Sequence, residues 1–394
     1  MESDCIKYLD LQTPCFILDE GKLEANIKDF YRVLNEHFNN AMIGYSFKTN
    51  SVPRVLELVK KLGCFAEVVS DDEFKLARKI GFQIDKIIFN GPIKDKDTFM
   101  EALSKGALIN IDSNREIEWL KDNIDKVDVG IRVNFDLERQ LPGQTSSAEY
   151  GGRFGFCYEN GELHKAITTL FNYGIRINRL HMHVSNSSKS VEVYRCLAEM
   201  ACKIISEENL AISQIDFGGG YFGGDDGGKK YEEYVSAIHD VLEKHNQEKC
   251  GVIVEPGASV IATCFSYLTS VIDTKETTYG RFVITDGTRL HIDPFMVRDK
   301  HNYITSKRNE SSKIRQCICG YSCMEKDRIM YVDEDEFQPG DTIEYQIVGS
   351  YTICFNSLFI MFLPRIYSKI RNKYIVIREK WDVDEYIQKC RWDF

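Results

Sequence analysis

The residues most suited to catalysis or ligand binding lie at the ends of short apolar runs: Lys48, His183, the glycines 218–220 and Glu255. A lysine amine that burial keeps neutral can act as a nucleophile toward a carbonyl group. Exposed N–H groups of a glycine run can bind a phosphate. A carboxylate can keep a proton on a ring nitrogen, and an imidazole can stack on a ring or exchange a proton. Together these groups suit an enzyme that uses pyridoxal 5'-phosphate.

The apolar runs belong to a regular alternation of strand-like and helical segments. Each run is short and rich in β-branched residues, and amphipathic stretches or long loops separate the runs. This repetition predicts a parallel sheet, and eight repeats match a (β/α)8 barrel of the TIM type, with an open doubly wound sheet as the alternative. A barrel would gather the ends of its strands at one mouth. The predicted strands are 41–47, 65–70, 86–91, 107–112, 128–133, 179–184, 214–220 and 251–257.

The sequence changes character after about residue 265. Short alternating runs are broken there by glycine and charged turns, without a long helical pattern, as is typical of an all-β domain. We therefore expect an α/β barrel domain over residues 21–265 and a C-terminal β domain over residues 266–394. The strand-like N-terminal segment, residues 1–20, is expected to join the β domain.

Composition excludes several classes of protein. The 394 residues are 43% hydrophobic and 28% charged, which indicates a globular chain with a large core. The net charge of −10, from 50 basic and 60 acidic side chains, disfavours a nucleic-acid binder. No apolar run approaches the roughly 20 residues of a membrane-spanning helix. The polar N-terminus shows no secretory signal, so we expect a cytoplasmic protein that does not bind membranes.

The thirteen cysteines are expected to be reduced thiols, because their number is odd and no export signal is visible. The densest group is Cys317, Cys319 and Cys323. A zinc site is disfavoured there because the sequence has no C-x-x-C pair, and no metal is expected. Gly218, Gly220 and Gly223 also satisfy G-x-G-x-x-G, but the motif follows the seventh strand rather than the first, which disfavours a dinucleotide site.

Several motifs, in order along nearly the whole chain, resemble the fold-type III pyridoxal phosphate decarboxylases. This family includes the diaminopimelate, ornithine, arginine and carboxynorspermidine decarboxylases. The resemblance implies a (β/α)8 barrel with a C-terminal β domain, in a homodimer whose active sites are shared across the interface. The motifs that carry it are TPCFILDE, YSFKTN, EVVSDDE, GIRVN, RFGF, HMHV, FGGG, EPG, GYSCMEKD and GSYT.

The resemblance assigns roles to individual residues. It makes Lys48 the Schiff-base lysine and Cys323 the acid that protonates the α-carbon from the partner subunit. It places the carboxylates Glu67 and Glu73 and the strand-five arginine, Arg132, near the cofactor. The other expected cofactor-binding residues are His183, Asn186, Gly218, Gly219, Gly220, Glu255, Gly257 and Tyr351. The expected substrate-binding residues are Arg153, Arg289, Met324 and Asp327.

Two departures from the family pattern bear on the substrate. Ala258 stands where the family has a phosphate-binding arginine, and Met324 stands where ornithine and diaminopimelate enzymes have an acidic residue. Since methionine cannot pair with an ammonium group, we expect an α-decarboxylase of a larger amino acid or one with a non-cationic far end, like carboxynorspermidine. The alternatives are a diaminopimelate decarboxylase and a racemase, although a racemase would more often have arginine than Glu255. A pure binding protein would have no reason to retain both Cys323 and Tyr351.

Overall fold

The computed structural model describes residues 6–121, 127–146, 150–186, 188–224, 230–306, 314–333 and 336–391. The chain forms two compact units, one of Glu24–Val260 and one of Met1–Leu23 with Ile261–Phe394. The divisions expected from the sequence, after residues 20 and 265, lie a few residues away from these. The difference arises because no loop marks either division, which falls within a helix in both places.

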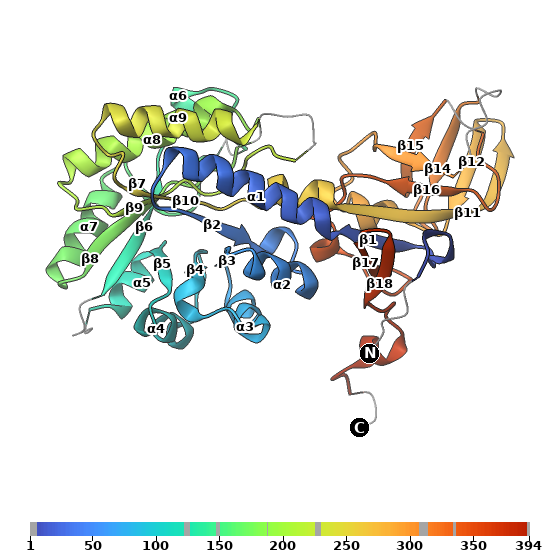
Figure 1. The fold of residues 1–394 in the computed structure, drawn as a ribbon, viewed down its shortest axis with the longest axis horizontal. Coiled ribbons are helices and arrows are strands. Elements are labelled where there is room, and N and C mark those ends of the chain that lie inside the picture. Colours follow the sequence, from blue (N-terminus) through green and yellow to red (C-terminus); the bar gives the residue numbers. More distant parts are fainter. Residues whose placement is uncertain are drawn as a thin grey trace. The chain divides into compact units, whose positions relative to one another are not determined.

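The larger unit is a closed barrel of eight parallel strands with helices around it (Figure 1). Pairing runs in order around the barrel, and the β5–β6 and β10–β2 pairs close it. The predicted TIM-type barrel is therefore confirmed, and the open sheet is excluded. The short β7 (Phe156–Cys157) adds to the end of β6. The barrel strands are β2 (Ala41–Ser46), β3 (Phe65–Val68), β4 (Ile87–Phe89), β5 (Leu108–Ile111), β6 (Asp128–Asn134), β8 (Arg176–His181), β9 (Gln214–Asp216) and β10 (Gly251–Val254).

Local sequence explains where the surrounding helices begin and end. The Ser70 hydroxyl accepts a hydrogen bond from the Glu73 N–H at the start of α3, and Gly81 ends that helix with a φ of 94°. Asp95 caps α4 in the same way. The helices of this unit are α1 (Glu20–His37), α2 (Pro53–Lys61), α3 (Asp71–Ile80), α4 (Lys96–Ser104), α5 (Asn114–Trp119), α6 (Leu137–Gln140), α7 (Glu162–Asn172), α8 (Val191–Glu207), α9 (Tyr231–Lys244) and α10 (Ala258–Ile261).

The smaller unit is built on a mixed sheet whose main path runs β15-β14-β12-β11-β1-β17-β18, with β16 on β11 and β13 on β16. The N-terminal strand β1 pairs antiparallel with β11 and parallel with β17. Two short helices, α11 (Arg289–Ile292) and α12 (Val383–Ile387), accompany it. The strands are β1 (Cys15–Asp19), β11 (Phe265–Thr277), β12 (Gly280–Thr285), β13 (Tyr303–Thr305), β14 (Gln316–Cys319), β15 (Arg328–Val332), β16 (Thr342–Tyr345), β17 (Arg365–Ile370) and β18 (Lys373–Arg378).

Every helix among the described residues is either too short or too polar to cross a lipid bilayer.

Candidate active site

Lys48 lies in the single turn Phe47–Thr49 that follows β2, at the mouth of the barrel. Its Nζ donates to Ser46 Oγ at 2.8 Å and to Glu67 Oε2 at 2.9 Å. The Ser46 hydroxyl donates to the same Glu67 oxygen at 2.6 Å. Gly257 packs against this turn so closely that a Cβ there would lie 2.0 Å from Thr49 Oγ1. The amine is thus held at one position by a buried carboxylate.

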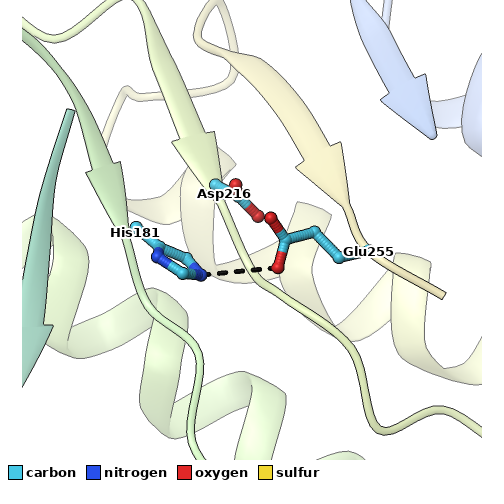
Figure 2. Close-up of side chains that lie close together, drawn as sticks. All are labelled: His181, Asp216 and Glu255. Carbon is cyan, nitrogen blue, oxygen red and sulfur yellow. Dashed lines mark ion pairs between the residues drawn. The ribbon is translucent and has the colours of Figure 1, made fainter. Parts of the chain in front are cut away.

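Glu255 follows β10 and lies in a buried cluster with His181 and Asp216 (Figure 2). His181 Nε2 lies 3.4 Å from Glu255 Oε2, and Asn90 Nδ2 donates to Glu255 Oε1 at 2.6 Å. Burial by itself would raise the pKa of Glu255, but contacts with His181, Lys48 and Asp216 outweigh burial and hold this pKa below its ordinary value.

The neighbours of Glu255 carry the opposite shifts. Burial and the charge of Glu255 raise the pKa of Asp216 well above its usual range, so Asp216 is the protonated partner. Burial lowers the pKa of His181, which leaves its ring neutral at pH 7. The cluster therefore carries one negative charge, on Glu255. That is the charge needed to keep a proton on a pyridine nitrogen.

His183 lies beyond the end of β8 and is fixed by the glycine run after β9. The Gly219 N–H donates to His183 Nδ1 at 3.1 Å, and burial followed by the charges of Arg132 and Lys48 lowers the pKa of His183. The ring is therefore neutral and accepts through Nδ1. Gly218 has a φ of 63°, and a Cβ there would lie 2.4 Å from the same nitrogen. Only glycine lets the loop and the ring approach each other this closely.

These features fit pyridoxal phosphate. The Lys48 amine, the ionised Glu255 carboxylate and the neutral His183 ring each follow the end of a barrel strand. The glycine run after β9 contacts the His183 ring. Asn186 Nδ2 is buried and has no hydrogen-bond partner among the described residues, while Asn186 Oδ1 accepts from the Lys189 N–H at 2.7 Å. An unused buried donor beside this loop suits a phosphate oxygen. Lys48, His183, Asn186, Glu255 and the glycine N–H groups would hold the cofactor.

A cavity of about 820 Å³ opens beside His183 within the same unit. Arg132, Arg139 and Arg153 line it, together with apolar and acidic side chains. Arg132 pairs with Asp112 at 3.3 Å, and Arg153 lies over the Phe154 ring at 4.1 Å. The predicted substrate residue Arg153 therefore shares a cavity with the predicted cofactor residue His183.

Two predicted substrate residues of the smaller unit are fully occupied by their own surroundings. Asp327 is buried, and its carboxylate accepts from the Arg289 N–H at 2.7 Å, Thr288 Oγ1 at 2.9 Å and the Ser322 N–H at 3.1 Å. The Arg289 side chain donates to Asp293 Oδ2 through Nε at 2.9 Å and Nη2 at 2.8 Å. Both side chains stabilise the local fold here, which weakens the expectation that they bind substrate.

Cys323, Met324 and Tyr351 also belong to the smaller unit. The Cys323 and Tyr351 side chains are exposed, and Tyr351 has a φ of 54°, in the left-handed region. Their assigned roles remain predictions.

The polar side chains inside the barrel were not predicted from the sequence. Asn90, Asn110, Arg179, His181 and Asp216 are all buried and contact one another or Glu255. A sequence signal was available, because each is a polar residue in or directly after an otherwise apolar strand run. Alternate residues of a barrel strand face the interior, and the sequence alone does not show which set does so.

The comparisons with known proteins agree with this geometry. Residues 22–262 match the model of the family described as "Pyridoxal-dependent decarboxylase, pyridoxal binding domain". The diaminopimelate decarboxylase of Methanocaldococcus jannaschii is 26% identical, over 96% of this chain and 91% of that protein. A crystal structure of diaminopimelate decarboxylase from M. jannaschii superposes with a TM-score of 0.87, at 24% identity over 97% of this chain and 93% of that one. The Helicobacter pylori enzyme complexed with L-lysine gives 0.80, at 22% identity over 97% of each chain.

These relatives correct the expected substrate. The expectation of a carboxynorspermidine-like substrate is wrong, since the similar proteins are diaminopimelate decarboxylases, the alternative named beside it. The error came from treating Met324 as the one partner of the substrate's far end. The arginine-lined cavity in the barrel offers other partners.

The family model spans more than half of the chain and includes every barrel residue described above. The chain therefore belongs to the pyridoxal-dependent decarboxylase family and is a carboxy-lyase that uses pyridoxal phosphate.

Proposed function

We propose that this enzyme removes a carboxyl group from diaminopimelate at the mouth of the barrel and releases lysine. Similarity to a diaminopimelate decarboxylase over 96% of the chain supports the proposal. The structural observation that carries it is the cavity beside His183, because diaminopimelate has a second carboxylate at its far end.

Three arginines and three carboxylates line this cavity, and two of the arginines are available to an anionic group. The carboxylates accept from neighbouring main-chain donors: Glu138 from the Thr145 N–H at 3.3 Å, Glu159 from the Asp136 N–H at 2.8 Å, and Asp136 from the Arg139 N–H at 3.0 Å. Arg139 and Arg153 form no ion pair with any residue that the structure describes. An arginine fork suits a carboxylate, so we assign Arg153 to the far end of the substrate.

The barrel residues divide the chemistry among them. Pyridoxal phosphate, when bound, withdraws electrons from the bond that releases carbon dioxide. Lys48 would provide the amine for the cofactor's aldehyde, and Glu67 holds that amine in place. Glu255, which remains ionised beside protonated Asp216, would keep the proton on the pyridine nitrogen. His183 offers a neutral ring face against the cofactor.

The proposed reaction ends with protonation of the α-carbon, for which we assign the exposed thiol of Cys323. We assign it in a homodimer, with the thiol supplied by the partner subunit. Apolar side chains exposed in the smaller unit support a second copy as the partner: Phe295, Val297, Phe355, Leu358 and Ile360. Phe295 and Phe355 lie edge to face, 5.1 Å apart. Mixing Lys48→Ala and Cys323→Ala proteins should restore activity, since one hybrid site in two would hold both groups. No recovery despite proven subunit exchange would contradict the shared site.

The substrate is tested by measuring carbon dioxide release from meso-diaminopimelate, ornithine, arginine and lysine by the cofactor-loaded protein. We expect diaminopimelate to have the highest kcat/KM, with lysine as product. Arg153→Gln should raise the KM for diaminopimelate about tenfold, as loss of a charge-assisted hydrogen bond does, whereas Arg32→Gln on exposed α1 should not. Efficient turnover of ornithine with none of diaminopimelate would overturn the proposal.

A further inference from the structure

A chain of hydrogen bonds runs through the barrel interior from Arg179 to two carboxylates. Arg179 Nε donates to Asn110 Oδ1 at 3.0 Å, and Asn110 Nδ2 donates to Asn90 Oδ1 at 2.8 Å. Asn90 Nδ2 then donates to Glu67 Oε1 at 3.0 Å and to Glu255 Oε1 at 2.6 Å. All five side chains are buried. We call Arg179, Asn110 and Asn90 the relay. It ends on Glu67, the carboxylate that holds Lys48, and on Glu255, the carboxylate assigned to the pyridine nitrogen.

The direction of the relay follows from the chemistry of arginine. A guanidinium group donates hydrogen bonds and cannot accept them, so Asn110 must turn its oxygen toward Arg179. Its nitrogen must then face Asn90, which accepts through its own oxygen. Asn90 is left with its nitrogen toward Glu67 and Glu255. One arginine at the start of the relay therefore fixes the orientation of two amides.

We propose that Arg179, Asn110 and Asn90 are positioning residues that hold Glu67 and Glu255 as acceptors in the geometry required to bind the cofactor. The proposal rests on the cofactor and is independent of the identity of the substrate. An amide of the opposite orientation at position 90 would present its oxygen to both carboxylates and repel them.

The barrel is shaped to contain this relay. Gly130 on β6 lies over it, and a Cβ there would be 1.9 Å from Asn110 Oδ1 and 3.0 Å from Arg179 Nε. The other two nitrogens of Arg179 also donate, Nη1 to Gln214 Oε1 at 3.0 Å and Nη2 to the Ile109 carbonyl at 3.2 Å. Barrel interiors are usually filled by branched apolar residues, and buried polar groups cost free energy unless they are paired. A fully paired polar column here is consistent with a role that apolar packing could not provide.

Asp216 lies beside the relay without reversing it. Asn110 Nδ2 lies 3.4 Å from Asp216 Oδ2, as a second and longer contact of the same donor. The Gly218 N–H donates to Asp216 Oδ1 at 3.0 Å. The Asn110 contact agrees with the orientation that Arg179 imposes, and the Gly218 contact holds Asp216 in place.

Two amide-to-carboxylate substitutions can distinguish an effect on cofactor binding from an effect on the stability of the fold. Asn110→Asp and Gln214→Glu each add a carboxylate beside Arg179, but only Asn110→Asp removes a donor from the relay. The dissociation constant of pyridoxal phosphate is measured by titrating each apoprotein and following the cofactor's absorbance. Thermal unfolding of the same apoproteins reports stability.

We expect Asn110→Asp to bind pyridoxal phosphate about ten- to a hundredfold more weakly, the range for a lost hydrogen bond to a charged group. Gln214→Glu should bind within twofold of the unmodified protein. Equal dissociation constants for the two variants would overturn the proposal. If Asn110→Asp does not fold, Arg179→Gln tests the same relay, because glutamine can present oxygen as readily as nitrogen to Asn110. A dissociation constant within twofold of the unmodified value would then overturn the proposal.

Discussion

Carboxylates are buried in both units, and their partners differ. In the barrel, Glu67 is bound by the side chains of Ser46, Lys48 and Asn90. In the smaller unit, Asp327 accepts mainly from backbone N–H groups of its own and a neighbouring loop. A carboxylate held by side chains can exchange one partner for a ligand while the backbone stays in place. A carboxylate held by the backbone is part of the fold, and freeing it would disrupt the loop.

Lys48→Ala, which removes a side-chain partner of Glu67, should have the largest effect on turnover. Decarboxylation should fall on the order of a thousandfold or more, since no other group takes over a covalent role. Thermal unfolding of the apoprotein should change much less than turnover, because the Lys48 side chain is 38% exposed and Ser46 and Asn90 still donate to Glu67. Steady-state rates and melting curves test both parts. A variant that retained full turnover would break the assignment of the barrel mouth.

Glu255→Gln should have the second largest effect. Glutamine keeps the shape but loses the negative charge, so we expect kcat to fall about 10²- to 10³-fold, as for loss of one electrostatic contact in an active site. The absorbance of the bound cofactor should also change, because the protonation of its ring nitrogen depends on this charge. Unchanged kcat and absorbance would show that Glu255 does not face the cofactor.

Asp327→Ala should lower the stability of the fold and leave cofactor binding unchanged, the opposite of the barrel variants. Three donors would lose their acceptor, at a cost of about 1–3 kcal/mol for a buried group left unsatisfied, so the free energy of unfolding should fall by at least that amount. Binding of pyridoxal phosphate to the folded variant should not change. Urea denaturation and cofactor titration measure the two quantities. Weaker cofactor binding with unchanged stability would place Asp327 in the active site after all.

The smallest effect concerns pH. Burial raises the pKa of Glu73 to about 7, with Glu67 adding to the rise and the Val69 N–H opposing it. A carboxyl group whose pKa is raised by folding binds more protons in the folded state between its two pKa values. The contribution of Glu73 to the free energy of unfolding is fully present below about pH 4.5 and is lost as the pH rises through 7.

The urea midpoint of the apoprotein should therefore fall between pH 5.5 and pH 8 more in the unmodified chain than in Glu73→Gln. Glutamine keeps an oxygen for the Val69 N–H, which Glu73 accepts at 2.8 Å, so the variant is a matched control. Identical pH dependence in the two proteins would exclude Glu73 as the titrating group.

The barrel was predictable because its signal is repetitive. Eight apolar runs, each followed by a helix or loop, leave few alternatives, and a strand of the structure overlaps each run. The boundaries were less accurate where polar residues interrupt a run. β8 starts at Arg176 and ends at His181, whereas the expected strand was 179–184, because the polar residues Arg176 and Asn178 interrupt its apolar pattern.

The polar interior of the barrel could not be predicted from single positions. Arg179 would ordinarily be assigned to the surface, and only the pairing of β8 with β6 and β9 turns it inward. Orientation of the Asn90 amide depends on residues up to 165 positions away in the sequence. The substrate expectation failed for a related reason. It depended on one residue, Met324, whereas recognition of a charged end depends on every group around a cavity.

The most direct test of the central assignment compares Lys48 with Lys94, a lysine of the same unit that also pairs with a buried carboxylate. Lys94 is completely buried and pairs with Glu116 at 3.0 Å, away from any described cavity. Borohydride reduction of the loaded protein fixes pyridoxal phosphate on the amine that it occupies, and peptide mapping identifies that amine. The account predicts a single label on Lys48. A label on Lys94 or another lysine, or no label at all, would contradict it.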